Sequence, residues 1–474
     1  MWSSEEIREA TKGTMLGSAF EASSVSIDSR KLAPGALFVP IKGERMDGHD
    51  YIKEALAKGA AGALVHRMPD GLKKGAPVVM VNDTYKALVD LAIAARKRTH
   101  ARIITVTGSV GKTGTKEAIR IATGSAGKVY ATQGNLNNHI GLPLSLANLP
   151  QDAGFGVFEL GMNHAGELSF LSRIVRPDIA VITNVEAVHL EFFANVEGIA
   201  DAKAEIMEGM QKDASLVLNR DNAYYHHLLT KAVGHGIRRI VTFGTHEEAD
   251  FRLLNYRLRD AGSQVDAIIC GTPITYPLGT TGRHWALTSL AALAAATQAD
   301  ADLANAAAAL MHFYEPEGRG KRVPVQLRQG EVTVIDDCYN ASPSSVNAAI
   351  AKLAELHDSA PGKGRKIAVL GDMLELGSMS ADLHKGLLAA LSEHRIDKVY
   401  GAGPLMKHLY DILPAPMRGG WAATSAELGE QVLKSLKAGD LVLIKGSRGS
   451  RMDLVRDLLF TAAHNDKKER ANAL

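Results

Sequence analysis

The chain lacks the features that mark secreted and membrane-bound proteins. Its 474 residues include only two cysteines, Cys270 and Cys338, which lie far apart in the sequence. Two distant cysteines exclude a disulfide framework and a cysteine zinc site, and they fit a reducing compartment. The N-terminal segment carries Glu5, Glu6 and Glu9 without an apolar core, so it is not a signal peptide. No apolar run approaches the length of a membrane span. We therefore expect a soluble, cytoplasmic protein without membrane insertion.

An excess of charge of one sign is also lacking. The chain has 54 Lys and Arg residues against 52 Asp and Glu residues, which leaves a formal net charge of +2. This balance argues against a nucleic-acid-binding stripe and against a polybasic membrane surface. A chain of 474 residues that is 46% hydrophobic has ample material for two to four globular domains.

Strand-like apolar segments alternate with helical segments along the chain, which predicts an α/β fold with three domains. A small N-terminal α/β domain is expected over residues 1–98, with strands at 36–40, 62–65 and 78–81. A central domain over 99–314 is expected to hold a mostly parallel sheet, with strands at 103–106, 156–160, 178–183, 215–219 and 240–243. A C-terminal Rossmann-like α/β domain over 315–474 follows the linker 316–320, with strands at 332–335, 366–370, 398–400 and 441–444.

The segment 107–113, Thr-Gly-Ser-Val-Gly-Lys-Thr, follows the strand at 103–106 and precedes a helical run; we call it the phosphate loop. In such a loop the backbone N–H groups and the helix N-terminus surround a β-phosphate. Lys112 would bind β- and γ-phosphate oxygens, and the Thr113 hydroxyl would bind Mg²⁺. The loop is a short variant, because Val106 stands where the common form has a further glycine. A plain strand-to-helix turn is the alternative, but the flanking strand and helix favour phosphate binding.

Polar side chains also follow two other strands of the central block. Glu159 ends one strand and His189 follows the next. Ligands of open α/β sheets bind at this edge, so the carboxylate and the imidazole could complete a Mg²⁺ or Mn²⁺ site beside the nucleotide. Taken singly, Glu159 could be a helix-cap partner and His189 a surface histidine. Lys203 lies in a helical run, where a solvated lysine is the default.

Several motifs together resemble the Mur ligase family of peptidoglycan synthesis, and the resemblance covers essentially the whole chain. The matching segments are 28–30 (Asp-Ser-Arg), 37–44, 47–50, the phosphate loop, 137–143 (Asn-Asn-His-Ile-Gly-Leu-Pro), 159–162, 336–343 (Asp-Asp-Cys-Tyr-Asn-Ala-Ser-Pro), 369–377 and 445–448 (Lys-Gly-Ser-Arg). The family fold implies a UDP-binding N-terminal domain, a phosphate-loop ATPase domain and a C-terminal domain that closes over it.

The resemblance also implies roles for particular residues. ATP would be bound by Gly108, Ser109, Gly111, Lys112, Thr113, Asn138, Arg322, Asp337 and Asn340. Two Mg²⁺ ions would be held by Thr113, Glu159, His189 and a carbamylated Lys203, with Lys112, Lys203 and His189 as the catalytic groups. The UDP portion of the substrate would be bound by Asp28, Ser29 and Arg30, and the incoming dipeptide by Lys445, Ser447 and Arg448.

The implied activity is ATP-dependent ligation of D-alanyl-D-alanine to UDP-N-acetylmuramoyl-tripeptide through an acyl phosphate, by a monomer with no nucleic-acid partner. A sister ligase that adds a single amino acid, a folylpolyglutamate-type ligase and a nucleotide-dependent switch are the alternatives. The N-terminal nucleotide-sugar block argues against the folate ligase. Four positions depart from the family pattern: Val110 and Gly114 at the loop, His139, and Thr288 near the expected adenine site.

Overall fold

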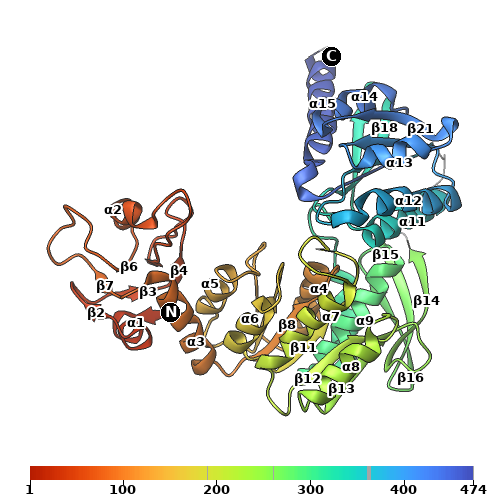
Figure 1. The fold of residues 1–474 in the computed structure, drawn as a ribbon. Helices are drawn as coiled ribbons and strands as arrows, with labels where there is room; N and C mark the ends of the chain where they lie inside the picture. The colour runs from red at the N-terminus through yellow and green to blue at the C-terminus, as the bar shows by residue number, and fades with distance from the viewer. Residues whose placement is uncertain (189, 260, 360–363, 473–474) are drawn as a thin grey trace.

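The computed structural model describes the chain except residues 189, 260, 360–363 and 473–474, and the side chains of 465–474 also lie outside the description. The predicted three-domain α/β organisation is confirmed, with three large sheets that each carry helices (Figure 1). The N-terminal and C-terminal sheets lie on different sides of the central one (Figure 1). Among the described helices, none combines the length and apolar character needed to cross a bilayer.

The N-terminal unit is built on a five-stranded sheet of order β2-β7-β6-β5-β4, in which only the β2–β7 pairing is antiparallel. Its core contains Leu37, Leu64 and Leu88, all fully buried. Ser3 and Glu6 form a capping box that starts the first helix. The elements are β1 (Trp2–Ser3), α1 (Ser4–Thr11), β2 (Thr14–Met15), β3 (Glu21–Ala22), β4 (Ser24–Ser26), β5 (Ala36–Phe38), α2 (Ile52–Ala57), β6 (Gly62–Val65), β7 (Val78–Met80) and α3 (Thr84–Arg98).

The central unit is a nine-stranded sheet of order β16-β15-β14-β13-β12-β11-β8-β10-β9. Successive residues of β8 face opposite sides of the sheet, and Ile103 and Ile104 belong to two different apolar cores. Each face of the sheet is therefore covered by helices. The parallel part comprises β8 (Arg102–Thr107), β9 (Val129–Ala131), β10 (Phe155–Glu159), β11 (Ile179–Ile182), β12 (Ser215–Asn219), β13 (Arg239–Gly244) and β14 (Phe251–Arg259). The helices are α4 (Lys112–Gly124), α5 (Gly141–Ala147), α6 (Glu167–Val175), α7 (Val196–Ala204), α8 (Tyr225–Gly234), α9 (Arg283–Gln298) and α10 (Leu303–Ala309).

The far edge of this sheet is an antiparallel meander that the sequence analysis did not predict. It pairs β14 with β15 (Gly262–Ile269) and β15 with β16 (Thr272–Leu278). β15 is largely buried, whereas β14 and β16 mix buried and exposed residues in partial alternation. β14 packs on α9 and β16 packs on α10. This addition makes the sheet mixed, although the part that carries the phosphate loop is parallel as predicted.

The C-terminal unit has a six-stranded sheet of order β17-β18-β22-β19-β20-β21, parallel except for the β17–β18 hairpin. Its strands are β17 (Lys321–Leu327), β18 (Gly330–Asp337), β19 (Lys366–Gly371), β20 (Lys398–Ala402), β21 (Arg418–Ala422) and β22 (Leu441–Lys445). The helices are α11 (Pro343–Ser359), α12 (Ser380–Glu393), α13 (Met406–Ile412), α14 (Ser425–Ser435) and α15 (Asp453–Asn472). The adjacent strands β18 and β22 both end in charged side chains, which face the central unit.

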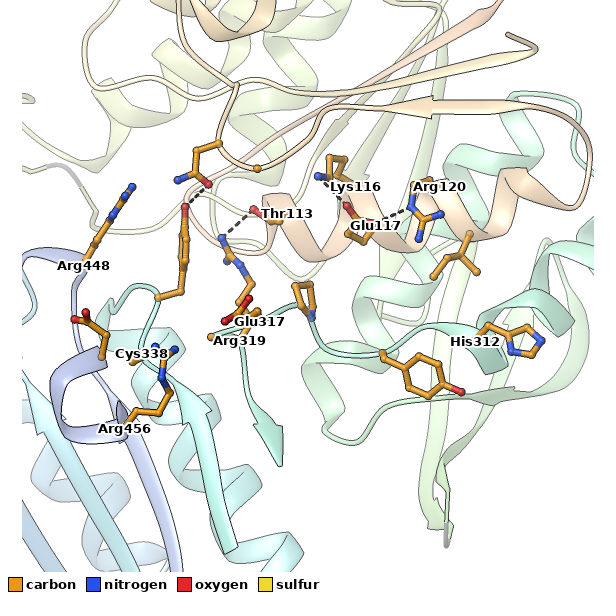
Figure 2. Close-up of a pocket in the computed structure, with 18 of the residues that line it drawn as sticks. Thr113, Lys116, Glu117, Arg120, His312, Glu317, Arg319, Cys338, Arg448 and Arg456 are labelled. Atoms are coloured by element: carbon orange, nitrogen blue, oxygen red, sulfur yellow. Dashed lines mark hydrogen bonds and ion pairs between the residues drawn. The ribbon is translucent and has the colours of Figure 1, made fainter. Parts of the chain in front are cut away.

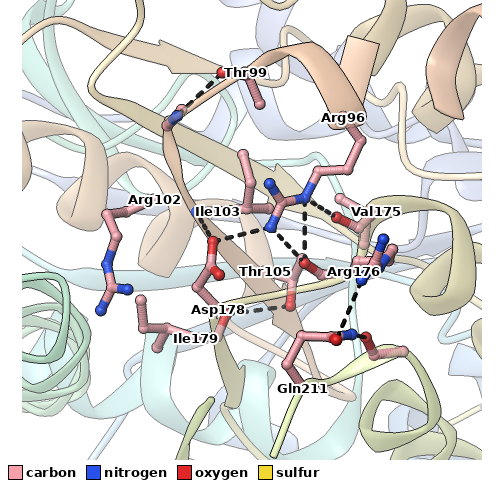
Figure 3. Close-up of polar contacts among 12 residues, drawn as sticks. Arg96, Thr99, Arg102, Ile103, Thr105, Val175, Arg176, Asp178, Ile179 and Gln211 are labelled. Atoms are coloured by element: carbon pink, nitrogen blue, oxygen red, sulfur yellow. Dashed lines mark hydrogen bonds and ion pairs between the residues drawn. The ribbon is translucent and has the colours of Figure 1, made fainter. Parts of the chain in front are cut away.

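One half-buried arginine joins the N-terminal unit to the central sheet (Figure 3). Arg96, in the last turn of α3, donates to the carbonyls of Val175 and Arg176 at 2.9 Å each and to the Asp178 carboxylate at 3.1 Å. The same carboxylate accepts the backbone N–H of Ile103 at 2.8 Å. Arg96 therefore satisfies free carbonyls at the end of α6 and fixes the start of β8, which leads into the phosphate loop, and the start of the neighbouring strand β11.

We expect Arg96→Met to lower the free energy of unfolding by about 1–3 kcal/mol, because partly buried carbonyls and a carboxylate lose their donor. Chemical denaturation followed by circular dichroism measures the change. Lys97→Met is the matched control, since Lys97 is an exposed cation on the same helix and should change stability by less than about 0.5 kcal/mol. Equal effects of the two substitutions would contradict a structural role for Arg96.

Candidate functional site

The phosphate loop has the backbone that an anion site requires. It connects the end of β8 to the start of α4, with Gly108 at φ 150° and Gly111 at φ 85°. A Cβ on Gly108 would lie 1.9 Å from Oγ1 of Thr183, so no side chain fits there. Thr183 donates to the Val110 carbonyl at 2.6 Å and ties the loop to the end of β11. No side chain caps the N-terminus of α4, which leaves its first N–H groups directed at the cleft.

Lys112 lies inside this loop. Its ammonium group donates to the carbonyls of Gly108 at 2.7 Å and Ser109 at 3.3 Å. Burial lowers the pKa of Lys112, Glu159 opposes that shift, and the nearby Arg319 adds to it. The lysine is thus held by neutral carbonyls at the place where anionic phosphate oxygens would compensate its charge.

Glu159 and Thr113 meet as the sequence analysis expected. The carboxylate of Glu159 is only 3% exposed. It accepts from the Thr113 hydroxyl at 2.8 Å and from the Asn137 amide at 2.9 Å. A buried carboxylate beside a hydroxyl is an oxygen donor set of the kind that Mg²⁺ prefers. Within the described residues no three His, Cys, Asp or Glu side chains converge, so substrate phosphate oxygens and water would have to complete the coordination.

Lys203 is not the solvated lysine that is the default for a helical run. It lies on α7 and is 2% exposed. Burial and the nearby charge of Lys112 lower the pKa of Lys203 far below its usual value. Within the described part of the chain, no hydrogen bond or ion pair involves its ammonium group. His189, the other expected metal ligand of this region, lies outside the described residues.

The arginine that reaches the phosphate loop is Arg319, whereas the sequence analysis assigned this role to Arg322. The guanidinium of Arg319 donates to the Thr113 hydroxyl at 2.9 Å and stacks 4.2 Å over the ring of Tyr339. Gly318 and Gly320, both with positive φ, give the segment the bend that aims Arg319 inward. Arg322 is exposed on β17 and lines neither cavity of the site.

The central and C-terminal units enclose a cleft of about 760 Å³ around these groups. A second cavity of about 930 Å³ adjoins it along α4 and shares Thr113, Arg319, Tyr339 and Arg448 with the cleft (Figure 2). Arg319 extends from the C-terminal side to the start of α4 in this view. The arginines that line the second cavity are Arg120, Arg319, Arg448, Arg451 and Arg456. The cationic surface therefore continues from the cleft around the first turns of α4.

The C-terminal wall of the cleft contains several of the predicted residues. Lys445, at the end of β22, pairs with Asp337 at 2.8 Å and donates to the carbonyl of Asn340 at 2.9 Å. Burial raises the pKa of Asp337, and Lys445 opposes that shift. Ser447 accepts the N–H of Leu374 at 2.9 Å. Asn340, Ser447 and Arg448 all line the cleft.

Two other groups of predicted residues occupy different positions. Asn138 lines the cleft, but its amide oxygen accepts the N–H of Gly141 at 2.8 Å and starts α5.

Asp28 and Arg30 form a bidentate pair, with both distances 2.9 Å, in the N-terminal unit. Arg30 holds the pKa of the Asp28 carboxyl at about 2. Ser29, between them, is buried, and its carbonyl accepts a hydrogen bond from Lys58 Nζ at 3.2 Å. These three residues do not line the cleft.

Sequence reasoning missed Asn137, Arg319, Glu186 and His284. Burial raises the pKa of Glu186 to about 7, although the Asn184 amide donates to its carboxylate. Burial and the nearby Lys352 lower the pKa of His284 to about 3. Glu186 belongs to the same strand-end segment as His189, so its position next to the phosphate loop was a usable signal.

Gly114 and Trp285 explain one departure from the family pattern. A Cβ on Gly114 would lie 2.3 Å from Cζ3 and 2.8 Å from Cη2 of Trp285. Trp285 is 5% exposed and packs against Phe313 with ring centroids 5.3 Å apart. The glycine in the first turn of α4 therefore makes room for the indole ring of α9. Thr288 lines the same cleft.

This arrangement defines a class of protein: a nucleotide-binding α/β protein whose phosphate loop faces a second α/β unit. Comparison with known families identifies the family within this class. Residues 21–98 match the Mur ligase family, catalytic domain; residues 106–296 match the Mur ligase middle domain; and residues 318–448 match the Mur ligase, glutamate ligase domain. The chain belongs to the Mur ligase family.

Individual relatives match over nearly their full length. The UDP-N-acetylmuramoyl-tripeptide–D-alanyl-D-alanine ligase of Rickettsia prowazekii is 34% identical over 457 residues, which cover 96% of this chain and 99% of the relative. A crystal structure of MurF from Acinetobacter baumannii is 27% identical with a TM-score of 0.83, covering 97% of this chain and 98% of that one. The MurF ligase of Thermotoga maritima in complex with ADP is 27% identical with a TM-score of 0.75, covering 94% and 98%.

We expect Gly114→Ala to destabilise the protein by about 1–3 kcal/mol, because the added methyl group overlaps the Trp285 ring in a packed core. Thermal unfolding followed by tryptophan fluorescence measures it. Gly124→Ala is the matched control on the same helix: its Cβ would meet nothing within 4 Å, and the substitution should stabilise by about 0.4–1 kcal/mol. Adding Trp285→Phe, which removes the clashing atoms, should recover part of the loss. A Gly114→Ala protein as stable as the parent would contradict the packing argument.

Proposed function

We propose that this chain is the ATP-dependent ligase that joins D-alanyl-D-alanine to UDP-N-acetylmuramoyl-tripeptide, giving UDP-N-acetylmuramoyl-pentapeptide, ADP and phosphate for peptidoglycan synthesis. The observation that carries the proposal is the meeting of Thr113, Glu159 and Arg319 at the mouth of the phosphate loop. The Rickettsia prowazekii relative is named for this reaction. The chain would act in the cytoplasm as a monomer, with domain limits at 1–98, 99–314 and 315–474.

ATP would bind with its phosphates in the phosphate loop. The uncapped N-terminus of α4, Lys112 and Arg319 would supply positive charge to the γ-phosphate. Asp337 and Asn340 would hold the nucleoside from the C-terminal side. The carboxylate of the tripeptide attacks the γ-phosphorus in line, forms an acyl phosphate and releases ADP. These cations stabilise the charge on the transferring phosphoryl group.

Thr113 and Glu159 would hold Mg²⁺, which would neutralise negative charge on the phosphates. Lys203 fits the carbamate that the family resemblance implies. Its lowered pKa favours the neutral amine, the form that attacks CO₂ with formation of an N–C bond and release of one proton. The carbamate anion would offset the nearby charge of Lys112 and add an oxygen donor for a second Mg²⁺. His189 remains a ligand of that ion predicted from the sequence alone.

The two substrates would be held at opposite ends of the site. Asp28, Ser29 and Arg30 would bind the uridine diphosphate portion in the N-terminal unit. Lys445, Ser447 and Arg448 would bind the dipeptide on the C-terminal wall, with Arg448 at the rim. Closure of the C-terminal unit over the central unit, about the segment 316–320, would exclude water from the acyl phosphate, because water would hydrolyse it before the dipeptide reacts.

Phosphate release measured with ATP, Mg²⁺ and UDP-N-acetylmuramoyl-tripeptide tests the proposal. Turnover should require D-alanyl-D-alanine and should produce the pentapeptide by mass spectrometry. Lys112→Ala should lower turnover by about a thousandfold or more while the fold is kept, because the γ-phosphate loses its point charge. Equal turnover without the dipeptide would reject the ligase, and strict use of one free amino acid would identify a sister enzyme.

We expect Lys203→Ala to be nearly inactive and to regain activity with added acetate or propionate, because a small carboxylate can occupy the place of the carbamate. The same phosphate-release assay measures the rescue as a function of carboxylate concentration. Lys212→Ala, at an exposed position nearby, should keep full activity and show no response to acetate. A Lys203→Ala enzyme without rescue at any concentration would count against carbamylation.

A further inference from the structure

The second half of the proposed reaction requires a base. The amino group of D-alanyl-D-alanine is an ammonium ion at neutral pH, and it must lose a proton before nitrogen can attack the acyl carbon. Most titratable groups of the cleft are bound to other partners or are too weakly basic to act as this base. Glu159 is held by Thr113 and Asn137 on the metal side, and Asp337 is paired with Lys445 at 2.8 Å. His284, with its pKa lowered to about 3, is too weak a base.

Glu186 stands at the junction of the phosphate loop and the C-terminal unit. Its backbone N–H donates to the hydroxyl of Ser109 at 2.9 Å, and that hydroxyl donates back to its carbonyl at 3.2 Å. Its carboxylate accepts from Asn184 on the same segment and from the hydroxyl of Ser344 in the first turn of α11. Glu186 lines the cleft. The carboxylate is therefore fixed between the loop that would hold the γ-phosphate and the wall that would hold the dipeptide.

We propose that Glu186 is the general base that deprotonates the ammonium group of the incoming dipeptide, an inference that rests on the proposed ligase function. One Glu186 oxygen takes a proton from the ammonium ion and leaves a neutral amine. The amine nitrogen forms a bond to the acyl carbon, and the carbon–oxygen bond to phosphate then breaks. The second nitrogen proton goes to the leaving phosphate, which departs as hydrogen phosphate. Glu186 returns its proton to solvent.

The surroundings of Glu186 suit this role. Its hydrogen-bond partners Ser109, Asn184 and Ser344 are neutral, so burial is the main influence on Glu186 and raises its pKa to about 7. A base whose pKa lies near the working pH is both free to accept a proton and strong enough to remove one. The other titratable and charged groups that line the same cleft are Lys112, Glu159, Glu167, His284, Arg319, Asp337, Lys352, Glu375, Lys445 and Arg448.

Glu186→Gln tests the proposal, because it keeps the shape and removes the basic oxygen. Ligation of D-alanyl-D-alanine at pH 7 should fall by about a hundredfold or more. The rise of kcat with pH through a pKa near 7 in the parent enzyme should disappear in the variant. Glu191→Gln is the matched control, since Glu191 is an exposed carboxylate in the same loop region, and it should keep parental turnover.

Hydroxylamine separates a base from a merely structural residue. This nucleophile is largely neutral at pH 7, so it captures the acyl phosphate as a hydroxamate without a protein base. Glu186→Gln should form hydroxamate within about threefold of the parent while dipeptide ligation is lost. Ser344→Ala, which removes the contact between the two units but keeps the carboxylate, should retain ligation within about tenfold.

Three results would overturn the proposal. They are unchanged ligation by Glu186→Gln, equal losses of ligation and hydroxamate formation, and a parental pH profile without a limb near pH 7. The profile of the parent enzyme provides this test even if the variant is unstable, and thermal melting checks that the variant folds. A failure of the proposed function would look different, because the parent itself would then show no dipeptide-dependent turnover.

Discussion

Basic side chains are crowded into a small, partly buried space at the carboxyl edge of the central sheet. Lys112 and Lys203 come from different helices, and the charge of the first lowers the pKa of the second. Arg319 adds a guanidinium from the other unit. Like charges in a low dielectric repel one another strongly, and removing them from water adds a further penalty. Such a cluster is favourable only when anions occupy the space between its members.

This requirement ties the chemistry to the fold. The phosphate loop supplies the backbone N–H groups, and Glu159 provides a buried negative charge among them. A nucleoside triphosphate brings most of the missing anionic charge, which explains why Lys112 is held by neutral carbonyls rather than by a carboxylate. A carboxylate partner would satisfy the lysine permanently and compete with the phosphates. The protein accepts an electrostatic cost in the ligand-free arrangement, and substrate binding relieves it.

Polar side chains make the contacts between the central and C-terminal units at the cleft. Arg319 reaches Thr113, Tyr339 bonds to Asn135, and Ser344 bonds to Glu186. Hydrogen bonds of this kind can be exchanged for water at little net cost, unlike an extensive apolar interface. In the proposed mechanism the units would separate to admit substrates and close again to shield the acyl phosphate, with the glycine-flanked segment around Arg319 crossing between them.

The sequence was sufficient for the three-domain α/β fold and for the place of the phosphate loop, because strand periodicity and glycine spacing are local properties. It was also sufficient to bring Thr113 and Glu159 together, since parallel strands end at one edge. Local sequence patterns did not indicate which arginine, Arg319 or Arg322, reaches the phosphate loop. The positive φ angles of Gly318 and Gly320 decide this, because they turn Arg319 inward and leave Arg322 exposed on β17. The meander β14–β16 went unpredicted because its alternation of buried and exposed residues is only partial.

The junction at Arg96 shows how remote structure constrains the site. The proposed UDP-binding residues lie in the N-terminal unit, whereas bond formation would occur in the cleft, so one extended substrate would have to contact both. Arg96 fixes α3 to the starts of β8 and β11, and β8 leads directly into the phosphate loop. A rigid junction at the base of this strand would set the distance between the uridine site and the γ-phosphate. Peptide length would then be selected by geometry, because a shorter peptide could not bring its carboxylate to the phosphorus, whatever its affinity for the uridine site.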